Sequence, residues 1–264
     1  MTDSSKRRGR FTVLDGPDGV GKGVFLNVFK DEAVKESKRV FDVHDFWKEH
    51  NYHPSPEEVL ASADVILTSE PTYIGVGRWA RDELVRSGRN YSSRAVAEAF
   101  ALDRLILYQE LVLPALDSGI DVFQSRSVSS GIAYQHIQSK NQIDQHKQGQ
   151  TIPPYKLDYL SQSDIMNIYG NAFCLKYPMD FLIIPVVLDF EEQFRRLHER
   201  EKQDNCTFEA VEFQAQVTET YRSAWFRQIF TDLGVTVAEF DAGQTKEFSQ
   251  QQARDFYRQH LRRS

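Results

Sequence analysis

The sequence contains little cysteine, and its two cysteines, Cys174 and Cys206, lie far apart in a chain of 264 residues. Disulfide scaffolds and cysteine-based metal sites need several cysteines at short spacings, so neither is expected, and a reducing cytoplasm suits this usage. No apolar run approaches the roughly 20 residues that span a bilayer, and the first residues lack the apolar core of a signal peptide. The sequence therefore predicts a cytoplasmic protein that does not associate with membranes.

The chain also lacks an excess of positive charge, because it has 32 lysines and arginines against 38 acidic residues and a net charge of −6. This balance argues against a general nucleic-acid binder, although local basic residues can still hold the phosphates of small nucleotides. The 41% hydrophobic and 27% charged content is typical of a globular protein. We expect a flexible basic tail over residues 1–10 and a single domain over residues 11–264.

Short apolar runs alternate with longer helical patterns, which favours an α/β fold with a parallel sheet and helices on both faces. The predicted strands are Arg10–Asp15, Arg39–Val43, Asp64–Thr68, Ile120–Gln124, Phe181–Leu188 and Val235–Phe240. The predicted helices are Gly21–Val34, Val76–Val85, Ser92–Leu116, Ser129–Gln138, Phe190–Glu201, Glu209–Leu233 and Glu247–Arg262. Two polar segments, near residues 45–56 and 140–156, are expected to be irregular surface insertions or mobile flaps.

The stretch that follows the first predicted strand has the spacing of a phosphate loop, with Gly16, Gly21 and Lys22 in the pattern Gly-x-x-x-x-Gly-Lys. Such a loop points backbone N–H groups and a helix N-terminus at an anion, and the lysine adds a positive charge. The usual Ser or Thr after the lysine is replaced by Gly23. The alternative is an ordinary glycine turn with a solvated lysine.

Four later blocks follow in order, and each is weak alone. They are Ser69-Glu70-Pro71-Thr72 before Ile74-Gly75-Val76-Gly77-Arg78; Phe100-Ala101-Leu102-Asp103-Arg104; Ser125-Arg126-Ser127 before Ser129–Gln135; and Val187-Leu188-Asp189 before a helix that carries Arg195, Arg196 and Arg200. Together with the loop, this order and spacing resembles the thymidylate kinases over residues 11 to about 245. The resemblance implies a three-layer P-loop kinase fold with a small lid near residues 196–208.

The resemblance also implies roles for individual residues. The phosphates of the donor ATP would be held by Gly16, Pro17, Asp18, Gly19, Val20, Gly21, Lys22, Gly23 and Val24. The acceptor nucleotide would meet Glu70, Phe100, Arg104, Arg126, Ser130, Tyr134 and Gln135. Charge on the transferring phosphate would be neutralised by Lys22, Arg126 and the lid residue Arg200. Asp18 would lie near Mg²⁺ or the acceptor sugar, and a homodimer would form through helices.

Each of these residues also has a purely structural interpretation. Phe100 and Tyr134 suit an ordinary core, and Arg104 could pair with Asp103 or Glu110 on the surface. The Glu70-Pro71 step could simply end a strand, because the residue before proline favours extended geometry. Arg126 could have a surface role, and the arginines of the lid could lie on a solvated helix face.

The sequence departs from the family pattern at both usual magnesium positions, because Gly23 replaces a hydroxyl residue and Ser125 replaces the aspartate of Asp-Arg-Tyr. Mg²⁺ keeps several waters and depends on substrate phosphates, so it need not be lost. The interpretation that we prefer is a dTMP kinase of nucleotide biosynthesis, which transfers the γ-phosphoryl group of ATP to dTMP to give dTDP. The alternatives are a deoxyribonucleoside kinase with Glu70 as its base, and a nucleotide-binding relative without catalysis.

Overall fold

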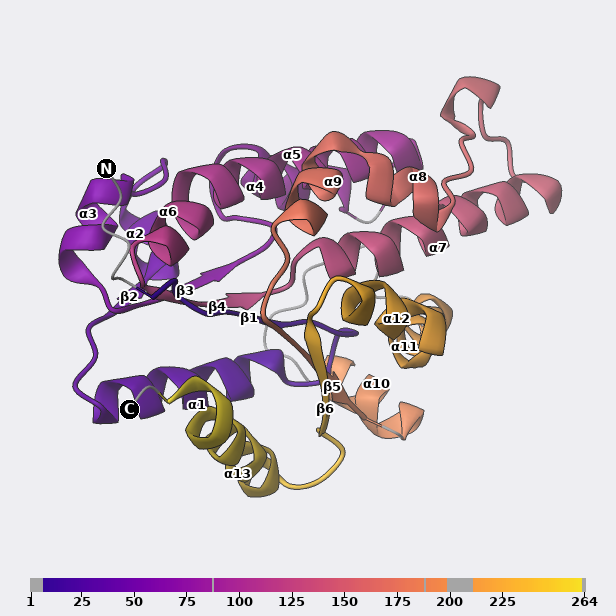
Figure 1. Ribbon diagram of the computed structural model, residues 1–264. Coiled ribbons are helices and arrows are strands. Elements are labelled where there is room, and N and C mark those ends of the chain that lie inside the picture. The colour runs from indigo at the N-terminus through magenta and orange to yellow at the C-terminus, as the bar shows by residue number, and fades with distance from the viewer. Residues whose placement is uncertain (1–6, 87, 188, 199–210, 263–264) are drawn as a thin grey trace.

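The structure is a computed structural model that describes residues 7–86, 88–187, 189–198 and 211–262. Its centre is a six-stranded, all-parallel sheet in the order β2-β3-β4-β1-β5-β6 (Figure 1). The strands are β1 (Phe11–Leu14), β2 (Val40–Asp42), β3 (Val65–Ser69), β4 (Asp121–Ser125), β5 (Phe181–Val186) and β6 (Thr236–Asp241). The six predicted strands and the parallel α/β sheet are therefore confirmed.

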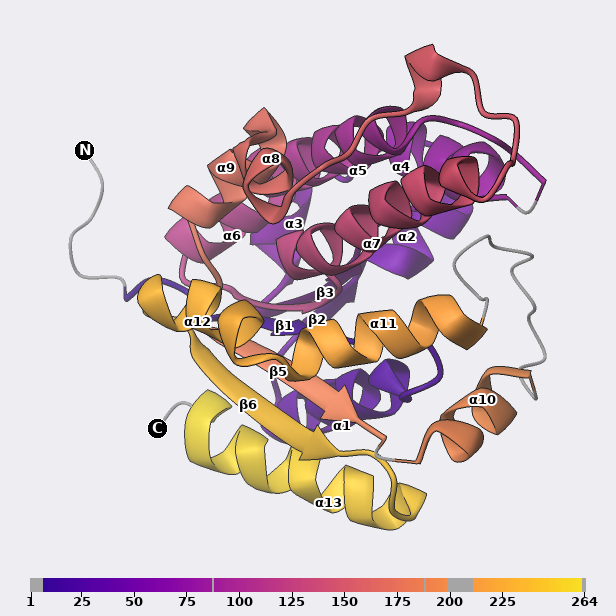
Figure 2. The same cartoon turned by 90° about the vertical axis from the view of Figure 1, so that its right-hand side faces the viewer.

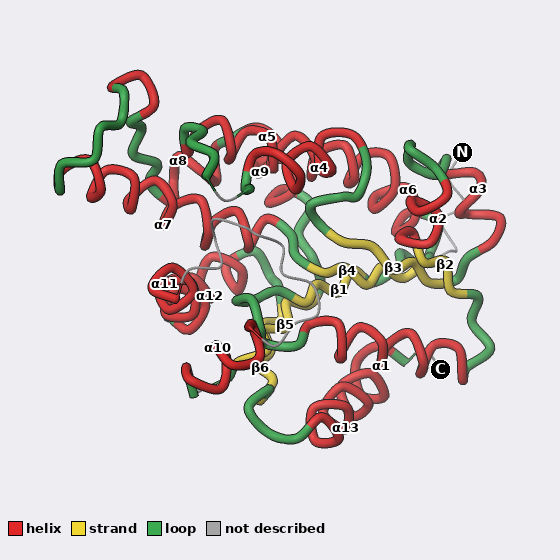
Figure 3. The backbone as a smooth tube through the Cα atoms, turned by 180° about the vertical axis from the view of Figure 1, so that it is seen from behind, coloured by secondary structure: helices red, strands yellow, loops and turns green. Residues whose placement is uncertain are grey.

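One face of the sheet is covered by α1 (Lys22–Lys35) and α13 (Lys246–Phe256), which lie side by side in Figure 3. Phe25 and Phe29 of α1 are buried against Phe123 of β4, Phe240 of β6 and Phe256 of α13. This packing places the N-terminus of α1 directly after the carboxyl end of β1. The phosphate loop is therefore held between two elements of the core.

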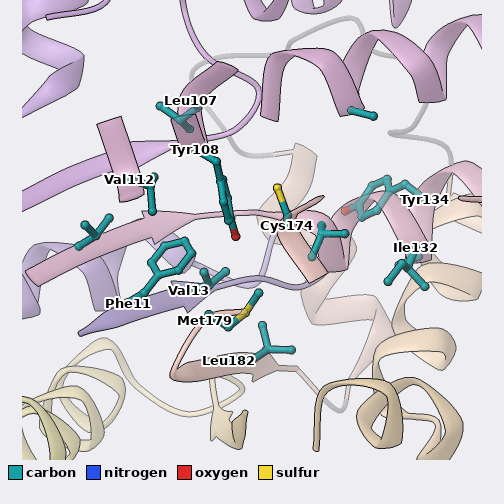
Figure 4. Close-up of a cluster of buried hydrophobic side chains, with 14 of the residues drawn as sticks. Phe11, Val13, Leu107, Tyr108, Val112, Ile132, Tyr134, Cys174, Met179 and Leu182 are labelled. Carbon is teal, nitrogen blue, oxygen red and sulfur yellow. The ribbon is translucent and has the colours of Figure 1, made fainter. Parts of the chain in front are cut away.

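The other face of the sheet carries the larger hydrophobic core (Figure 4). The helices of this core include α4 (Gly75–Trp79), α5 (Ser93–Leu107), α6 (Leu113–Asp117), α7 (Val128–Lys147), α8 (Gln162–Asn167), α9 (Tyr169–Lys176), α11 (Val211–Arg222) and α12 (Ala224–Asp232). Figure 4 shows Tyr108 reaching down to Phe11 of β1, with the ring centroids 5.5 Å apart. The predicted helix over Ser92–Leu116 is confirmed, with a π-helical stretch over Tyr108–Val112 joining α5 to α6.

Some boundaries differ from prediction. The expected helix over Glu209–Leu233 is divided into α11 and α12, because Ser223 adopts an extended conformation and its hydroxyl caps α12. Figure 2 shows these two helices between α7 and the β5–β6 edge. α10 (Phe190–His198) lies beside the carboxyl edge, and the rest of the helix predicted there lies outside the described residues.

The expectation of two irregular insertions is partly wrong. The first contains α2 (Val43–Glu49) and leads into α3 (Pro56–Ser62), where a Ser55–Glu58 capping box offsets the cost of starting a short helix. The second begins as the continuation of α7 to Lys147, which Figures 1 and 3 show projecting beyond the sheet. None of the helices in the described ranges is long and apolar enough to cross a membrane.

Candidate active site

The site lies at the carboxyl edge of the sheet, where β3, β4 and β1 end together. In the strand register, Ser125 of β4 pairs with both Ser69 of β3 and Leu14 of β1. The three segments that follow these residues therefore lie side by side. They are the phosphate loop, the Glu70-Pro71 segment and the loop that carries Arg126. In open parallel sheets, ligands bind in the crevice outside this edge.

The phosphate loop turns through two glycines, Gly19 and Gly21, whose φ angles are +84° and +79°. Residues that carry a side chain rarely adopt these φ angles, so glycine is required for the turn. Gly21 is the N-cap of α1 and makes no side-chain cap. The N-terminus of α1 therefore offers backbone N–H groups that can donate hydrogen bonds to an anion, as the Gly-x-x-x-x-Gly-Lys spacing predicts.

Lys22 holds its ammonium group inside the loop. The Nζ atom donates to the carbonyl oxygens of Gly16 at 3.0 Å and Pro17 at 2.6 Å, and lies 3.8 Å from the Asp18 carboxylate. Its side chain is only 9% exposed. The alternative of a solvated lysine in an ordinary turn is therefore wrong.

Arg126 stands opposite the phosphate loop on the segment between β4 and α7. Its φ of +65° is a conformation that non-glycine residues rarely adopt, which is typical of functional loops. Two hydrogen bonds of 2.9 Å hold it, from its N–H to the Leu14 carbonyl and from Gln124 Nε2 to its own carbonyl. The guanidinium lies 5.0 Å from the centre of the buried Tyr134 ring. The surface alternative for Arg126 is therefore wrong.

A buried carboxylate, Asp15, ties these two loops together. It accepts hydrogen bonds from both loops and from α11, and its donors are Gly16 N, Ser127 N, Ser129 Oγ, Ser130 Oγ and Tyr221 Oη. Arg126 Nη1 lies 3.8 Å away from it and donates to Ser130 Oγ at 3.0 Å. A fully buried carboxylate needs hydrogen-bond donors, and these donors come from different segments, so Asp15 fixes the relative position of the loops.

The second carboxylate, Asp18, carries the direct contact between the loops. It forms an ion pair with Arg126 and accepts a hydrogen bond from Gln214 Nε2 at 3.1 Å. The Asp18 N–H donates to Gln214 Oε1 at 2.8 Å, and the Asp18 carbonyl accepts from Gln193 Nε2 of α10 at 2.9 Å. Although burial opposes the charged form, Asp18 raises the pKa of Arg126 well above its ordinary value, and Tyr134 and Asp15 add to this effect.

Glu70 and Arg104 form a buried ion pair with both side chains under 5% exposed. Arg104 Nε donates to Glu70 Oε2 at 2.6 Å, and its two terminal nitrogens donate to Asn171 and to the Ser127 carbonyl. The other Glu70 oxygen accepts from Gln124 Nε2 at 2.9 Å. Arg104 therefore does not pair with Asp103 or Glu110 on the surface, and that alternative is wrong.

Asp103, next to Arg104, anchors a different segment. Its carboxylate accepts from the Thr72 N–H at 2.8 Å and from the Thr72 hydroxyl at 2.6 Å, and burial raises its pKa. A Cβ on Gly77 would lie 2.4 Å from the Thr72 hydroxyl and 2.5 Å from the Asp103 carboxylate. Glycine is therefore required in α4 for this close approach.

The structure gathers most of the residues that the motifs singled out. Lys22, Asp18, Arg126, Ser130 and Tyr134 form one connected cluster, and Glu70 with Arg104 forms a second that reaches it through Gln124. Phe100 is half-buried against the main core, and Gln135 is buried on α7. Arg200 lies outside the described residues, as does most of the expected lid.

The contributors that were not predicted include Asp15 and the amides Gln193, Gln214 and Asn171. Asp15 was visible as an acidic residue at the end of an apolar strand, next to the first glycine of the loop. Such a charge at the carboxyl edge of a sheet is a signal for a functional site. The three amides lie on helices without a motif, so no local pattern distinguished them from surface residues.

The described residues do not assemble a magnesium site. No group of three His, Cys, Asp or Glu side chains among them could hold a metal ion. The proposed ligand Asp18 is paired with Arg126 and lies close to Lys22, and these two positive charges oppose a cation. The metal role expected for Asp18 therefore does not fit this arrangement.

Burial raises the pKa of Glu70 to about 7, and nearby Asp103 adds to this against the opposing charge of Arg104. An unfolded glutamate titrates near pH ~4.3, so folding favours its protonated form. This contribution to stability is present below that value and is lost as the pH rises to about 7. We expect the unfolding free energy to fall by roughly 3–4 kcal/mol across this window from Glu70 alone.

Urea denaturation at several pH values, with Glu70→Gln as the control, checks this expectation. Glutamine keeps an oxygen for Arg104 but cannot titrate. The difference between the two curves isolates Glu70 from His53, whose pKa burial lowers to about 4 and which destabilises the fold as the pH falls. Parallel curves for the two proteins would contradict the assignment.

Together, the parallel sheet, the phosphate loop and the facing basic cluster define a three-layer P-loop kinase fold. The thymidylate kinase of Candida albicans has a similar solved structure, with a TM-score of 0.59 and 18% identity, covering 96% of this chain and 93% of that chain. At this identity, the similarity establishes the fold.

Sequence comparison finds thymidylate kinases among the relatives of part of this chain. Residues 57–164 match the family model described as thymidylate kinase. A probable thymidylate kinase of Pyrococcus abyssi is 30% identical over 132 residues, which are 48% of this chain and 52% of that protein. That of Caldivirga maquilingensis is 27% identical over 128 residues, 48% of this chain and 50% of that protein. The resemblance to thymidylate kinases is confirmed, and the chain spans about half the length of these relatives.

Proposed function

We propose that this protein is a thymidylate kinase that transfers the γ-phosphoryl group of ATP to dTMP, giving dTDP and ADP. The observation that carries the proposal is the position of Arg126, whose guanidinium faces the phosphate loop and pairs with Asp18. Phosphoryl transfer needs a phosphate cradle and a positive charge near the transferred group, and little else from the protein. The acceptor phosphate is itself the nucleophile, so no strong general base is required.

In this proposal, the donor phosphates bind the backbone N–H groups of the loop over residues 16–24, and Lys22 and Arg126 neutralise charge during transfer. Ser130 and Tyr134 hold the Arg126 guanidinium toward the acceptor phosphate. Phe100 and the buried Arg104 lie on one helix and would meet the acceptor base, with Glu70 fixing the guanidinium. Gln135 and Arg200 keep their proposed roles, in the acceptor site and on the transferring phosphate.

A deoxyribonucleoside kinase would need a carboxylate that accepts the proton of a 5′-hydroxyl. Glu70 is the candidate, but its two oxygens already accept hydrogen bonds from Arg104 and Gln124, and it is 3% exposed. These contacts favour a structural carboxylate over a general base. The thymidylate kinase proposal therefore explains the site better.

An acceptor screen tests the proposal directly. ADP release from ATP is measured with each nucleoside monophosphate and with thymidine, in the presence of magnesium salt. We expect the highest kcat/KM with dTMP and no measurable turnover with thymidine. Turnover of thymidine instead would establish a nucleoside kinase, and ATP binding without transfer to any acceptor would establish a protein that only binds nucleotides.

We also propose a cytoplasmic homodimer formed through helices, on the ground of the resemblance to thymidylate kinases. Light scattering coupled to size-exclusion chromatography measures the mass directly. One chain has a mass of 30.5 kDa. A measured mass equal to one chain at assay concentrations would remove the dimer from the proposal without affecting the activity.

A further inference from the structure

Three polar side chains at the edge of the sheet form a chain of hydrogen bonds that the proposed reaction does not use. Asp42 ends β2, His44 lies in the first turn of α2, and Ser69 ends β3. His44 Nδ1 lies 2.8 Å from Asp42 Oδ1, and its Nε2 lies 2.7 Å from Ser69 Oγ. We call these three residues the edge relay.

The direction of the hydrogen bonds follows from the charge on Asp42. Although burial opposes ionisation, hydrogen bonds from His44 and Lys30 lower the pKa of Asp42 well below its ordinary range. The Lys30 ammonium lies 3.0 Å from the second carboxylate oxygen. An ionised carboxylate can only accept, so His44 Nδ1 donates to Asp42, and a second hydrogen bond joins Nε2 to the Ser69 hydroxyl.

An aspartate, histidine and serine in this order can also activate a nucleophile. Here Ser69 is 6% exposed, and the half-buried imidazole packs against the rings of Trp47 and Tyr73, with centroids 5.6 and 5.7 Å away. A nucleophile must reach its substrate, whereas this hydroxyl is held inside the protein. The edge relay is therefore built to fix the position of Ser69.

Ser69 is joined by one peptide bond to Glu70, the carboxylate that organises the acceptor side of the site. The Glu70 N–H donates to the Ser125 carbonyl at 2.9 Å. Its carboxylate binds Arg104 and Gln124, and Gln124 also binds the Arg126 carbonyl. Any movement of Ser69 would therefore be transmitted to both arginines of the proposed acceptor site.

We propose that His44 is a positioning residue, which fixes Ser69 and thereby holds Glu70 and its partner Arg104 in the geometry that binds the acceptor nucleotide. This inference rests on the proposed function and deepens it. It assigns a purpose to the segment that contains β2 and α2. That segment lies at the β2 edge of the sheet and supplies an imidazole to the end of the neighbouring strand β3.

The test compares His44→Ala and Ser69→Ala with wild type. Losing one buried hydrogen bond costs ~1–1.5 kcal/mol, so we expect the KM for dTMP to rise about tenfold. The KM for ATP should stay unchanged, because the phosphate loop does not touch the edge relay. The double variant should be no worse than either single variant, since both break the same hydrogen bond. A general loss of stability would instead affect both substrates.

The matched control is His50→Ala. His50 ends the same helix and packs on Phe46 and Tyr52, with ring centroids 4.3 and 5.3 Å away. Removing it disturbs the segment without touching Ser69, so the KM for dTMP should not change. His44→Gln should recover part of the loss, because its amide can reach the Ser69 hydroxyl. An equal rise in KM for His50→Ala would overturn the proposal.

Amide hydrogen exchange of residues 68–74 provides a readout that does not depend on turnover. We expect faster exchange there in His44→Ala and Ser69→Ala, and wild-type exchange in His50→Ala. If wild type phosphorylates no nucleotide, the proposed function fails, and this measurement alone decides whether His44 holds Glu70. Unchanged exchange in both relay variants would overturn the inference, even in an active enzyme, as would faster exchange with an unchanged KM for dTMP.

Discussion

Replacing Lys22 with methionine should lower the rate of dTMP-dependent ADP formation by about 100- to 1000-fold. This range is typical when one preorganised group that stabilises transition-state charge is removed. The methionine side chain has a similar length but no charge, so the phosphate loop keeps its shape and loses its cation. Single-turnover measurement of phosphoryl transfer at saturating ATP and dTMP checks the expectation.

Two controls accompany Lys22→Met. The ammonium binds two loop carbonyls, so the variant should lose only about 1–2 kcal/mol of unfolding free energy. Lys35→Met on the same helix removes an exposed ammonium that pairs with Glu32 at 2.7 Å. This control should keep the wild-type rate. A Lys22→Met protein that transfers phosphate as fast as wild type would show that the chemistry lies elsewhere.

Arg126 is a less direct probe of the same chemistry. Its guanidinium pairs with Asp18 and lies 3.8 Å from the fully buried Asp15. Removing it would leave the buried Asp15 without the nearby guanidinium and Asp18 with Lys22 alone, so a lost rate would combine lost stability with lost catalysis. Lys22 lies in the same site without this complication, and its substitution therefore gives the clearer result.

The outline of this site could be predicted because its signals are local. The loop spacing, the strand before it and the helix after it are contiguous over Phe11–Leu26, and each obeys a short-range rule. The Glu70, Arg104 and Arg126 blocks follow strands or lie on helices that periodicity also locates. Their proximity follows from parallel topology, because the carboxyl ends of neighbouring strands meet at one edge.

The networks that hold the site could not be predicted, because their members are far apart in the chain. Asp15 is bound by Tyr221 over a separation of 206 residues, and Arg104 by Asn171 over 67. Periodicity assigns each of these residues a face of its own helix or strand, but not its partner. The two predictions of irregular insertions were partly wrong for a different, local reason. Composition alone did not show the capping of α3 or the continuation of α7.

Replacing Arg104 with methionine should lower the unfolding free energy by about 3–5 kcal/mol, as expected when one partner of a buried ion pair is removed. Three acceptors lose their donor, namely the Glu70 carboxylate, the Asn171 amide and the Ser127 carbonyl. Urea denaturation measures the loss. Arg94→Met is the control on the same helix, because its guanidinium lies on the surface and pairs with Asp158 there. It should cost less than ~1 kcal/mol.

Combining Arg104→Met with Glu70→Gln separates stability from acceptor binding. The double variant no longer buries an unpaired carboxylate, so we expect it to be more stable than Arg104→Met alone. If Arg104 also reads the acceptor base, dTMP binding measured by calorimetry should stay weak in the refolded double variant. Recovery of binding together with stability would show that Arg104 only supports the fold. In that case the proposed acceptor site would retain Phe100, Arg126 and Tyr134 without it.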